Sequence, residues 1–147
     1  DWPRSVYAHQ AALYRAQLDI FPMDKNRARR AVRELEEWLR KHPDNPLCAT
    51  HWMLIGLAYT APFNDPAQAV AAYKKAESIG LPEHVQLDAY YWRIGNLAQK
   101  VGDQKTASEY YRKIIVEIGK SGFAYEAQLR LRDMGEQPPE LRDVLAE

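Results

Sequence analysis

A short pattern of small and apolar residues recurs three times in this chain, at an interval of 38 residues. Each copy has a small residue, a large residue four positions later and a further apolar residue three positions after that. The copies are Ala31, Leu35 and Trp38; Ala69, Tyr73 and Ala76; and Ala107, Tyr111 and Ile114. This spacing places the three side chains on one face of a helix. Such a repeat indicates stacked helical hairpins, which form surfaces for partners more often than catalytic pockets.

Proline, glycine and aspartate residues divide the chain into seven predicted helices. They are expected at about residues 5–21, 24–41, 47–60, 66–79, 82–101, 103–118 and 123–134. The short connections between them favour antiparallel neighbours. We therefore expect an all-α fold, a right-handed α-solenoid of antiparallel helix pairs that forms a single domain over residues 1–147. The seventh helix and a last short turn from Glu140 to Leu145 are expected to cap the final pair.

The composition argues against several classes of protein. Twenty basic and twenty acidic residues cancel to a net charge of zero, which argues against a nucleic-acid binder or a polybasic membrane-surface module. A basic run lies in the second predicted helix, but Arg30 and Glu34 stand four residues apart, as do Arg33 and Glu37. We therefore expect ion pairs along a solvated helix face. No apolar run approaches the ~20 residues that a membrane span needs.

The residue types that carry enzyme chemistry show no recognisable spacing. We find no nucleophile motif, phosphate-binding loop, dinucleotide fingerprint or pair of catalytic carboxylates. Cys48 and His51 stand three residues apart, as metal ligands on a helix do, but the remaining histidines show no ligand spacing. We expect a buried thiol beside a hydrogen-bonded imidazole there. The chain is therefore predicted to be no enzyme and to hold no catalytic residues, cofactor or metal.

Two consecutive helix pairs carry the residues of a known repeat. The first pair has Trp52, Ile55, Gly56 and Tyr59, followed by Ala69, Tyr73 and Ala76; the next has Tyr91, Ile94, Gly95 and Ala98, followed by Ala107, Tyr111 and Ile114. These residues resemble the tetratricopeptide repeat, a helix–turn–helix unit with the patterns W-x2-L-G-x2-Y and A-x3-F-x2-A. The resemblance implies a degenerate repeat at residues 5–43, repeats at 47–82 and 86–119, and a capping helix and tail at 121–147.

The glycines of the repeat have a physical role. Gly56 and Gly95 are expected where the paired helices approach most closely, because a side chain there would push the helices apart. The first helix of the degenerate repeat has Leu18 at the position that corresponds to Gly56. Four residues of that helix are spaced to share one face: Tyr7, Ala11, Tyr14 and Leu18.

Two finer resemblances concern the branch of the family and its location. The 38-residue period exceeds the usual repeat of about 34 residues and is similar to the longer Sel1-like repeats. Residues 123–131, which read FAYEAQLRL, are similar to segments of tetratricopeptide proteins of the bacterial envelope, such as outer-membrane assembly lipoproteins and the Tol–Pal coordinator. This similarity favours the bacterial periplasm or the outer membrane as the location.

The family resemblance also implies a binding surface. Tetratricopeptide arrays hold an extended peptide or a helix of another protein in a concave groove, which is lined by the first helix of each pair. The groove residues implied for this chain are Met53, Leu57 and Thr60 in one repeat and Trp92, Arg93 and Asn96 in the next. Adjacent side chains of a helix diverge by about 100°, so Tyr90, Tyr91 and Trp92 cannot all point in one direction.

Two functions follow as hypotheses. The first is a non-enzymatic scaffold or adaptor that binds a segment of a partner protein in a groove built on the third, fifth and seventh predicted helices. Apolar side chains would be buried around Trp92, with polar contacts to Arg93 and Asn96. The alternative is an accessory subunit that is permanently assembled in a larger complex, which could be associated with a membrane. Neither hypothesis includes a nucleic-acid partner or a transmembrane span of this chain.

Overall fold

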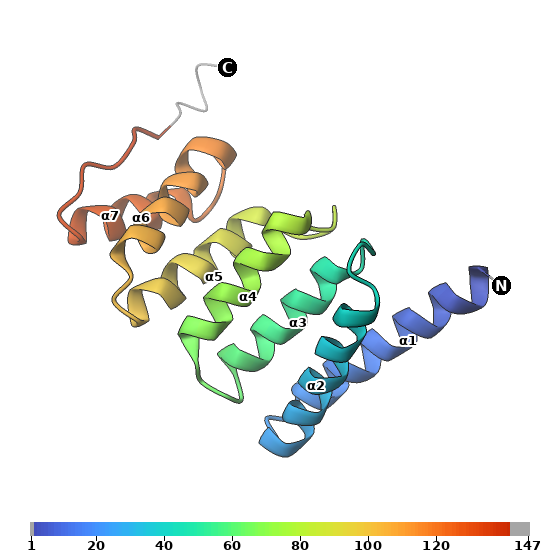
Figure 1. Ribbon diagram of the computed structural model, residues 1–147. Helices are drawn as coiled ribbons and strands as arrows, with labels where there is room; N and C mark the ends of the chain where they lie inside the picture. Colours follow the sequence, from blue (N-terminus) through green and yellow to red (C-terminus); the bar gives the residue numbers. More distant parts are fainter. Residues whose placement is uncertain (1, 142–147) are drawn as a thin grey trace. The chain divides into compact units, whose positions relative to one another are not determined.

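The computed structural model describes residues 2–141, with side chains from residue 8 onward (Figure 1). Within that range the chain is all-α, as the sequence predicts, and its helices pack in consecutive pairs. The helices are α1 (Trp2–Ile20), α2 (Lys25–Lys41), α3 (Cys48–Thr60), α4 (Pro66–Ile79), α5 (Leu87–Lys100), α6 (Gln104–Lys113), the π-helix η1 (Ile114–Ile118) and α7 (Ala124–Asp133). None of these described helices is both long and apolar enough to span a bilayer.

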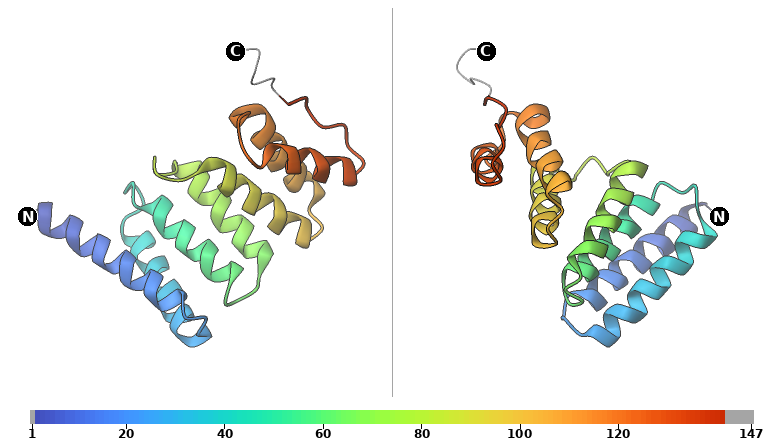
Figure 2. Two further views of the ribbon diagram at one scale, coloured as in Figure 1. Left: turned by 180° about the vertical axis from the view of Figure 1, so that it is seen from behind. Right: turned by 60° about the vertical axis from the view of Figure 1, so that its left-hand side comes forward.

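The helices form two compact units. The first unit is Asp1–Pro82 and holds α1 to α4; the second is Glu83–Glu147 and holds α5 to α7. In the first unit α1 pairs with α2 and α3 pairs with α4, while α3 also packs against α2 (Figure 2). In the second unit α5 pairs with α6, and both α6 and η1 pack against α7. The division of the chain into repeats at residues 5–43, 47–82 and 86–119 stays a prediction.

Aspartate side chains begin three of the helices. Asp24 Oδ1 accepts hydrogen bonds from the backbone N–H groups of Asn26 and Arg27 at the start of α2. Asp65 precedes α4, whose first residue is a proline, and Asp103 caps α6 in the same way. These side chains satisfy N–H groups that have no partner within the helix, and each such cap stabilises a helix by about 1 kcal/mol. The caps therefore fix where the second helix of each pair begins.

The recurring pattern forms the core of the helix pairs. Its alanines, Ala31, Ala69 and Ala107, are buried, and so are Tyr73 and Tyr111. The first unit has a further cluster of buried residues that joins α1 to α4, which includes Ile20, Leu35 and Ile55. The spacing of four and three residues thus marks the buried face of each second helix, as the sequence predicts.

The buried face of α1 differs from the face that apolar spacing indicates. Tyr14 and Leu18 are 65% and 51% exposed, and Ala11 is exposed as well. Among the described side chains of α1, from residue 8 onward, the buried ones are Ala16 and Ile20, which lie on a different side of the helix. The side chain of Tyr7, which was expected on the same face as Tyr14, lies outside the described side chains.

Two predicted boundaries also differ. Helix α5 begins at Leu87 rather than near Pro82, and the helix expected over residues 103–118 changes from α-helix to π-helix at Ile114. The π-helix ends where Gly119 N–H donates to the Ile114 carbonyl at 3.2 Å. The predicted last turn from Glu140 to Leu145 falls mostly outside the described residues; Leu141, which is described, is exposed and non-helical.

Candidate functional site

An aromatic cluster in the second unit surrounds Trp92, one of the predicted groove residues. Trp92 lies on α5 and is half-buried. Its ring stacks on Phe123, the residue that precedes α7, with ring centroids 5.4 Å apart and planes 26° apart. A second ring, that of Tyr111 on α6, lies with its centroid 5.4 Å from that of Trp92. Trp92 is thus held by side chains from two neighbouring helices, which limits its rotamer freedom.

A polar network continues from this cluster along α5. The hydroxyl of Tyr111 lies 2.6 Å from Asn96 Oδ1 and 2.6 Å from Gln99 Oε1. Arg130 on α7 donates to Gln99 Oε1 at 3.1 Å, and its guanidinium carbon lies 5.4 Å from the centre of the Trp92 ring. Burial raises the pKa of Tyr111 to about 12, so its hydroxyl is a neutral donor at physiological pH. The α5–α7 side of this unit therefore combines an aromatic platform, a cation and amide groups.

The structure brings only some of the predicted groove residues together. Trp92 and Asn96 belong to the network just described, and Arg93 is exposed on the same helix. In the first unit, Met53, Leu57 and Thr60 are half-buried along α3. The Thr60 hydroxyl donates to the Gly56 carbonyl at 2.9 Å, so this group is engaged within its own helix.

Phe123 and Arg130 were not singled out by the sequence analysis, although they complete the surroundings of Trp92. Both belong to the seventh helix and the residue before it, which are expected to cap the last pair and also to contribute to the groove, although no groove residue is named there. The order of the helices could have identified them. In a repeat array, the helix that follows a complete pair such as α5 and α6 packs on the same side as the first helix of that pair. Its side chains were therefore candidates for the same surface.

A second aromatic cluster lies in the first unit, around Trp38. The indole N–H of Trp38 donates to His9 Nδ1 at 2.8 Å. The rings of His51 and His42 stack on the indole with centroids 3.8 Å and 4.5 Å away. The buried Cys48 thiol donates to the His42 carbonyl at 3.0 Å, and the His51 Nδ1–H donates to the Leu47 carbonyl at 2.7 Å.

This cluster agrees with the expected buried thiol and hydrogen-bonded imidazole at Cys48 and His51. Burial lowers the pKa of His51, with smaller contributions from His9 and His42 in the same direction and an opposing one from the hydrogen bond to Leu47. Among residues 2–141, no group of three or more histidine, cysteine or acidic side chains is arranged to hold a metal ion. The cluster is therefore a packed part of the first unit, in which the histidines are stacking partners.

The helix pair that carries Trp92 is also the part of the chain that resembles a known family. Residues 88–115 match the tetratricopeptide repeat. The tetratricopeptide match runs from the first turn of α5 into η1 and so contains Trp92, Arg93 and Asn96. No curated protein and no solved structure matches the chain. The similarities to Sel1-like repeats and to envelope proteins therefore rest on the sequence segments alone.

Proposed function

We propose that this protein is a non-enzymatic interaction module that holds a segment of a partner protein against the α5–α7 side of the second unit. The tetratricopeptide match supports binding of a protein partner, because such repeats present extended surfaces and are typically non-catalytic. The observation that carries the proposed site is Trp92, which is half-buried and held against Phe123. A preorganised tryptophan is a frequent hot spot, because little side-chain entropy is lost when a partner covers it.

The surroundings of Trp92 indicate the chemistry of the partner segment. Its aromatic ring offers an apolar contact, while Arg93 is exposed one position further along α5. Asn96 adds an amide that can bond to a peptide backbone. We infer that the segment places an apolar side chain on Trp92 and a carboxylate or carbonyl group near Arg93. Met53, Leu57 and Thr60 on α3 are proposed as the corresponding residues of the first unit.

The test begins with a pull-down from native extract, in which mass spectrometry identifies the partner. Calorimetry with the identified segment then compares the intact protein with Trp92→Ala and Asn96→Ala. We expect Trp92→Ala to weaken binding at least ~10-fold, which corresponds to about 1.4 kcal/mol. Val116→Ala, which alters an exposed side chain on η1, serves as the matched control. Unchanged affinity of Trp92→Ala with intact helicity would contradict the proposed site.

The alternative, a subunit fixed in a larger assembly, is favoured by a different observation. Three large apolar side chains of the first unit are exposed on or just after α1, namely Tyr14, Leu18 and Phe21. They lie three or four residues apart and so share a helix face, as apolar residues of a buried interface do. If the protein sediments as a stable monomer and Leu18→Ser leaves its assembly in extract unchanged, this alternative is contradicted.

A further inference from the structure

Three adjoining hollows lie on one face of the first unit, where α2, α3 and α4 meet. Their volumes are about 290, 260 and 360 Å³. Glu36 borders all three, so they are neighbours on this face, and we call the three together the α2–α4 groove. Sites for small molecules usually measure about 300–1,000 Å³, so each hollow is near the lower limit of that range. The size of each suits an inserted side chain better than a cofactor.

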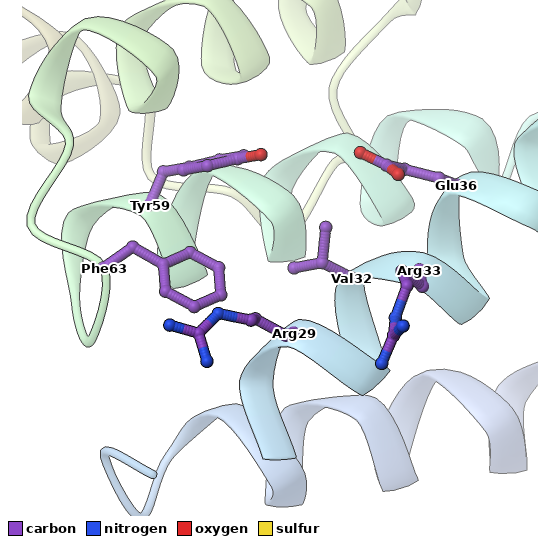
Figure 3. A pocket seen from close by; sticks show the side chains of 6 residues that line it. All are labelled: Arg29, Val32, Arg33, Glu36, Tyr59 and Phe63. Carbon is purple, nitrogen blue, oxygen red and sulfur yellow. The ribbon is translucent and has the colours of Figure 1, made fainter. Parts of the chain in front are cut away.

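Helix α3 forms the floor of the groove, and the two flanking helices form its walls. Helix α3 packs against both α2 and α4, whereas the described residues show no comparable packing of α2 against α4. Trp52 and Tyr59 of α3 are half-buried between the walls, and the buried side chain of Ile55 borders the same hollow beneath them. Figure 3 shows one of the hollows, in which the side chains of Tyr59 and Glu36 extend toward one another.

The walls of the groove are mainly basic. Arg29, Arg33 and Arg40 line it from α2 and Lys75 lines it from α4, against the single carboxylate of Glu36. All four basic residues are exposed. This excess is local, because the whole chain has a net charge of zero. An apolar floor between basic walls is complementary to an apolar segment with acidic flanks.

The ion pairs predicted for α2 do not neutralise this wall. The sequence predicts a pair between Arg33 and Glu37, but Glu37 binds Lys41 at 3.0 Å instead. Arg29 donates to the neutral amide of Asn26 at 2.9 Å. Arg33 is therefore exposed to solvent, as expected, but the predicted pairing with Glu37 is wrong. The basic side chains of the wall are available to an acidic partner.

We propose that the α2–α4 groove binds an acidic amphipathic helix of a partner protein. The α2 wall extends from Arg29 to Arg40, which corresponds to about 16 Å or three helical turns. Apolar residues at positions i, i+3 or i+4, and i+7 of a docked helix would project at intervals of about 5–6 Å and enter the successive hollows. Aspartate or glutamate residues beside them would face the arginines of α2 and Lys75.

This surface is distinct from the site in the proposed function. The proposed function assigns Trp92 to the site in the second unit and, separately, the Met53–Leu57–Thr60 face of α3 to the first unit. The groove is lined by Trp52, Ile55 and Tyr59, which lie on a different face of α3, about 130° away around the helix axis at 100° per residue. The two proposed surfaces therefore use different residues.

The experiment is a phage-display selection on the full chain, with a library of helix-forming peptides of about 16 residues whose faces are randomised. Two groove variants are compared with the intact protein: the double charge reversal Arg33→Glu/Arg40→Glu, and Ala71→Arg, which fills the α4 wall. Arg30→Glu is the matched control, since Arg30 is exposed on α2 but does not line the groove. Circular dichroism verifies the helicity of each variant.

We expect the enriched peptides to be acidic, with apolar residues every three or four positions. Their affinity should fall at least ~10-fold with the double reversal and with Ala71→Arg, and less than ~2-fold with Arg30→Glu or Trp92→Ala. Enrichment of basic or non-periodic peptides, no enrichment, or equal binding to the double reversal would overturn the proposal. A homodimer in sedimentation that Ala71→Arg dissociates would also overturn it, because a second copy would then occupy the groove.

Discussion

Gly56 lies directly against the ring of Tyr73, so close that a Cβ on Gly56 would stand 2.8 Å from the Tyr73 Cε1 atom. The tyrosine is buried, with only 1% of its surface exposed. Gly95 and Tyr111 repeat this relationship in the second unit, with a corresponding distance of 2.6 Å. In both pairs the absent side chain is what allows the two helices of the repeat to pack closely.

The first prediction tests these contacts. Gly56→Ala and Gly95→Ala should each lower the free energy of unfolding by about 1–3 kcal/mol, because the added methyl group overpacks a buried ring. Urea unfolding followed by circular dichroism measures the change. Gly122→Ala is the control, since a Cβ at Gly122 meets no atom within 4 Å, and it should change stability by less than about 0.5 kcal/mol. Equal stability of Gly56→Ala and the intact protein would mean that the Tyr73 ring can shift at no cost.

The second prediction concerns pH and the cluster around Trp38. Burial lowers the pKa of His51 below the usual value of 6.5. The unfolded chain therefore takes up a proton at a higher pH than the folded chain, so stability is fully present above pH 6.5 and is lost as the pH falls toward the lowered pKa.

Urea unfolding at pH 7.5 and pH 5 should show the lower stability at pH 5. NMR titration of the His51 ring should give a pKa below that of a model peptide. His84→Gln provides the control, because His84 is exposed and lies in the other unit, and this variant should keep the full pH dependence. A His51 ring that titrates at or above pH 6.5 would contradict the prediction.

The third prediction concerns alkaline pH and Tyr111. Its pKa is raised by burial to about 12, with a smaller opposing contribution from Arg130. Because the unfolded chain loses this proton near pH 10 and the folded chain near pH 12, the stabilisation is complete below pH 10 and is lost between pH 10 and 12. Unfolding measured by circular dichroism across this range, with phenolate absorbance recorded in parallel, checks the result.

Tyr111→Phe should remove this part of the pH dependence. The variant also leaves Asn96 and Gln99 without the hydrogen bonds from the hydroxyl, so it should lower the free energy of unfolding by about 1 kcal/mol at neutral pH.

The helix pairs could be predicted from the sequence because they depend on local patterns. The repeat of the pattern from Ala69 to Ala107 predicts the buried face of a helix, and a proline or an aspartate predicts where a helix begins. The start of α5 was misplaced because Pro82 fits the first position of a helix, whereas the actual start at Leu87 follows Gln86, whose side chain makes no capping hydrogen bond and so gives no local signal. Local signals were thus sufficient where several of them agreed.

The candidate sites depend on contacts between residues far apart in the chain, and these were predicted only in part. Trp92 was identified from its place in the repeat, but its partners Phe123 and Arg130 became visible only once α7 was packed. His9 and Trp38 are 29 residues apart, and nothing in their spacing indicates that they meet. The groove between α2 and α4 likewise requires three helices to be placed before it exists.

The rotation of α1 about its own axis, which decides which of its side chains are buried, was also not predictable from the local sequence pattern. It supports a last prediction. When the repeats are aligned, Leu18 occupies the position that corresponds to Gly56, which is buried. In the folded helix, however, Leu18 is exposed and Ile20 is buried, with 1% of its surface exposed. Leu18→Ala should therefore change the free energy of unfolding of the isolated chain by less than about 0.5 kcal/mol, whereas Ile20→Ala should cost about 2–5 kcal/mol through lost burial and a cavity. Urea unfolding of the two variants under identical conditions measures the difference. If Leu18→Ala proved the more destabilising of the two, α1 would have the rotation that the repeat alignment implies, and the exposed apolar face on Tyr14, Leu18 and Phe21 would not exist.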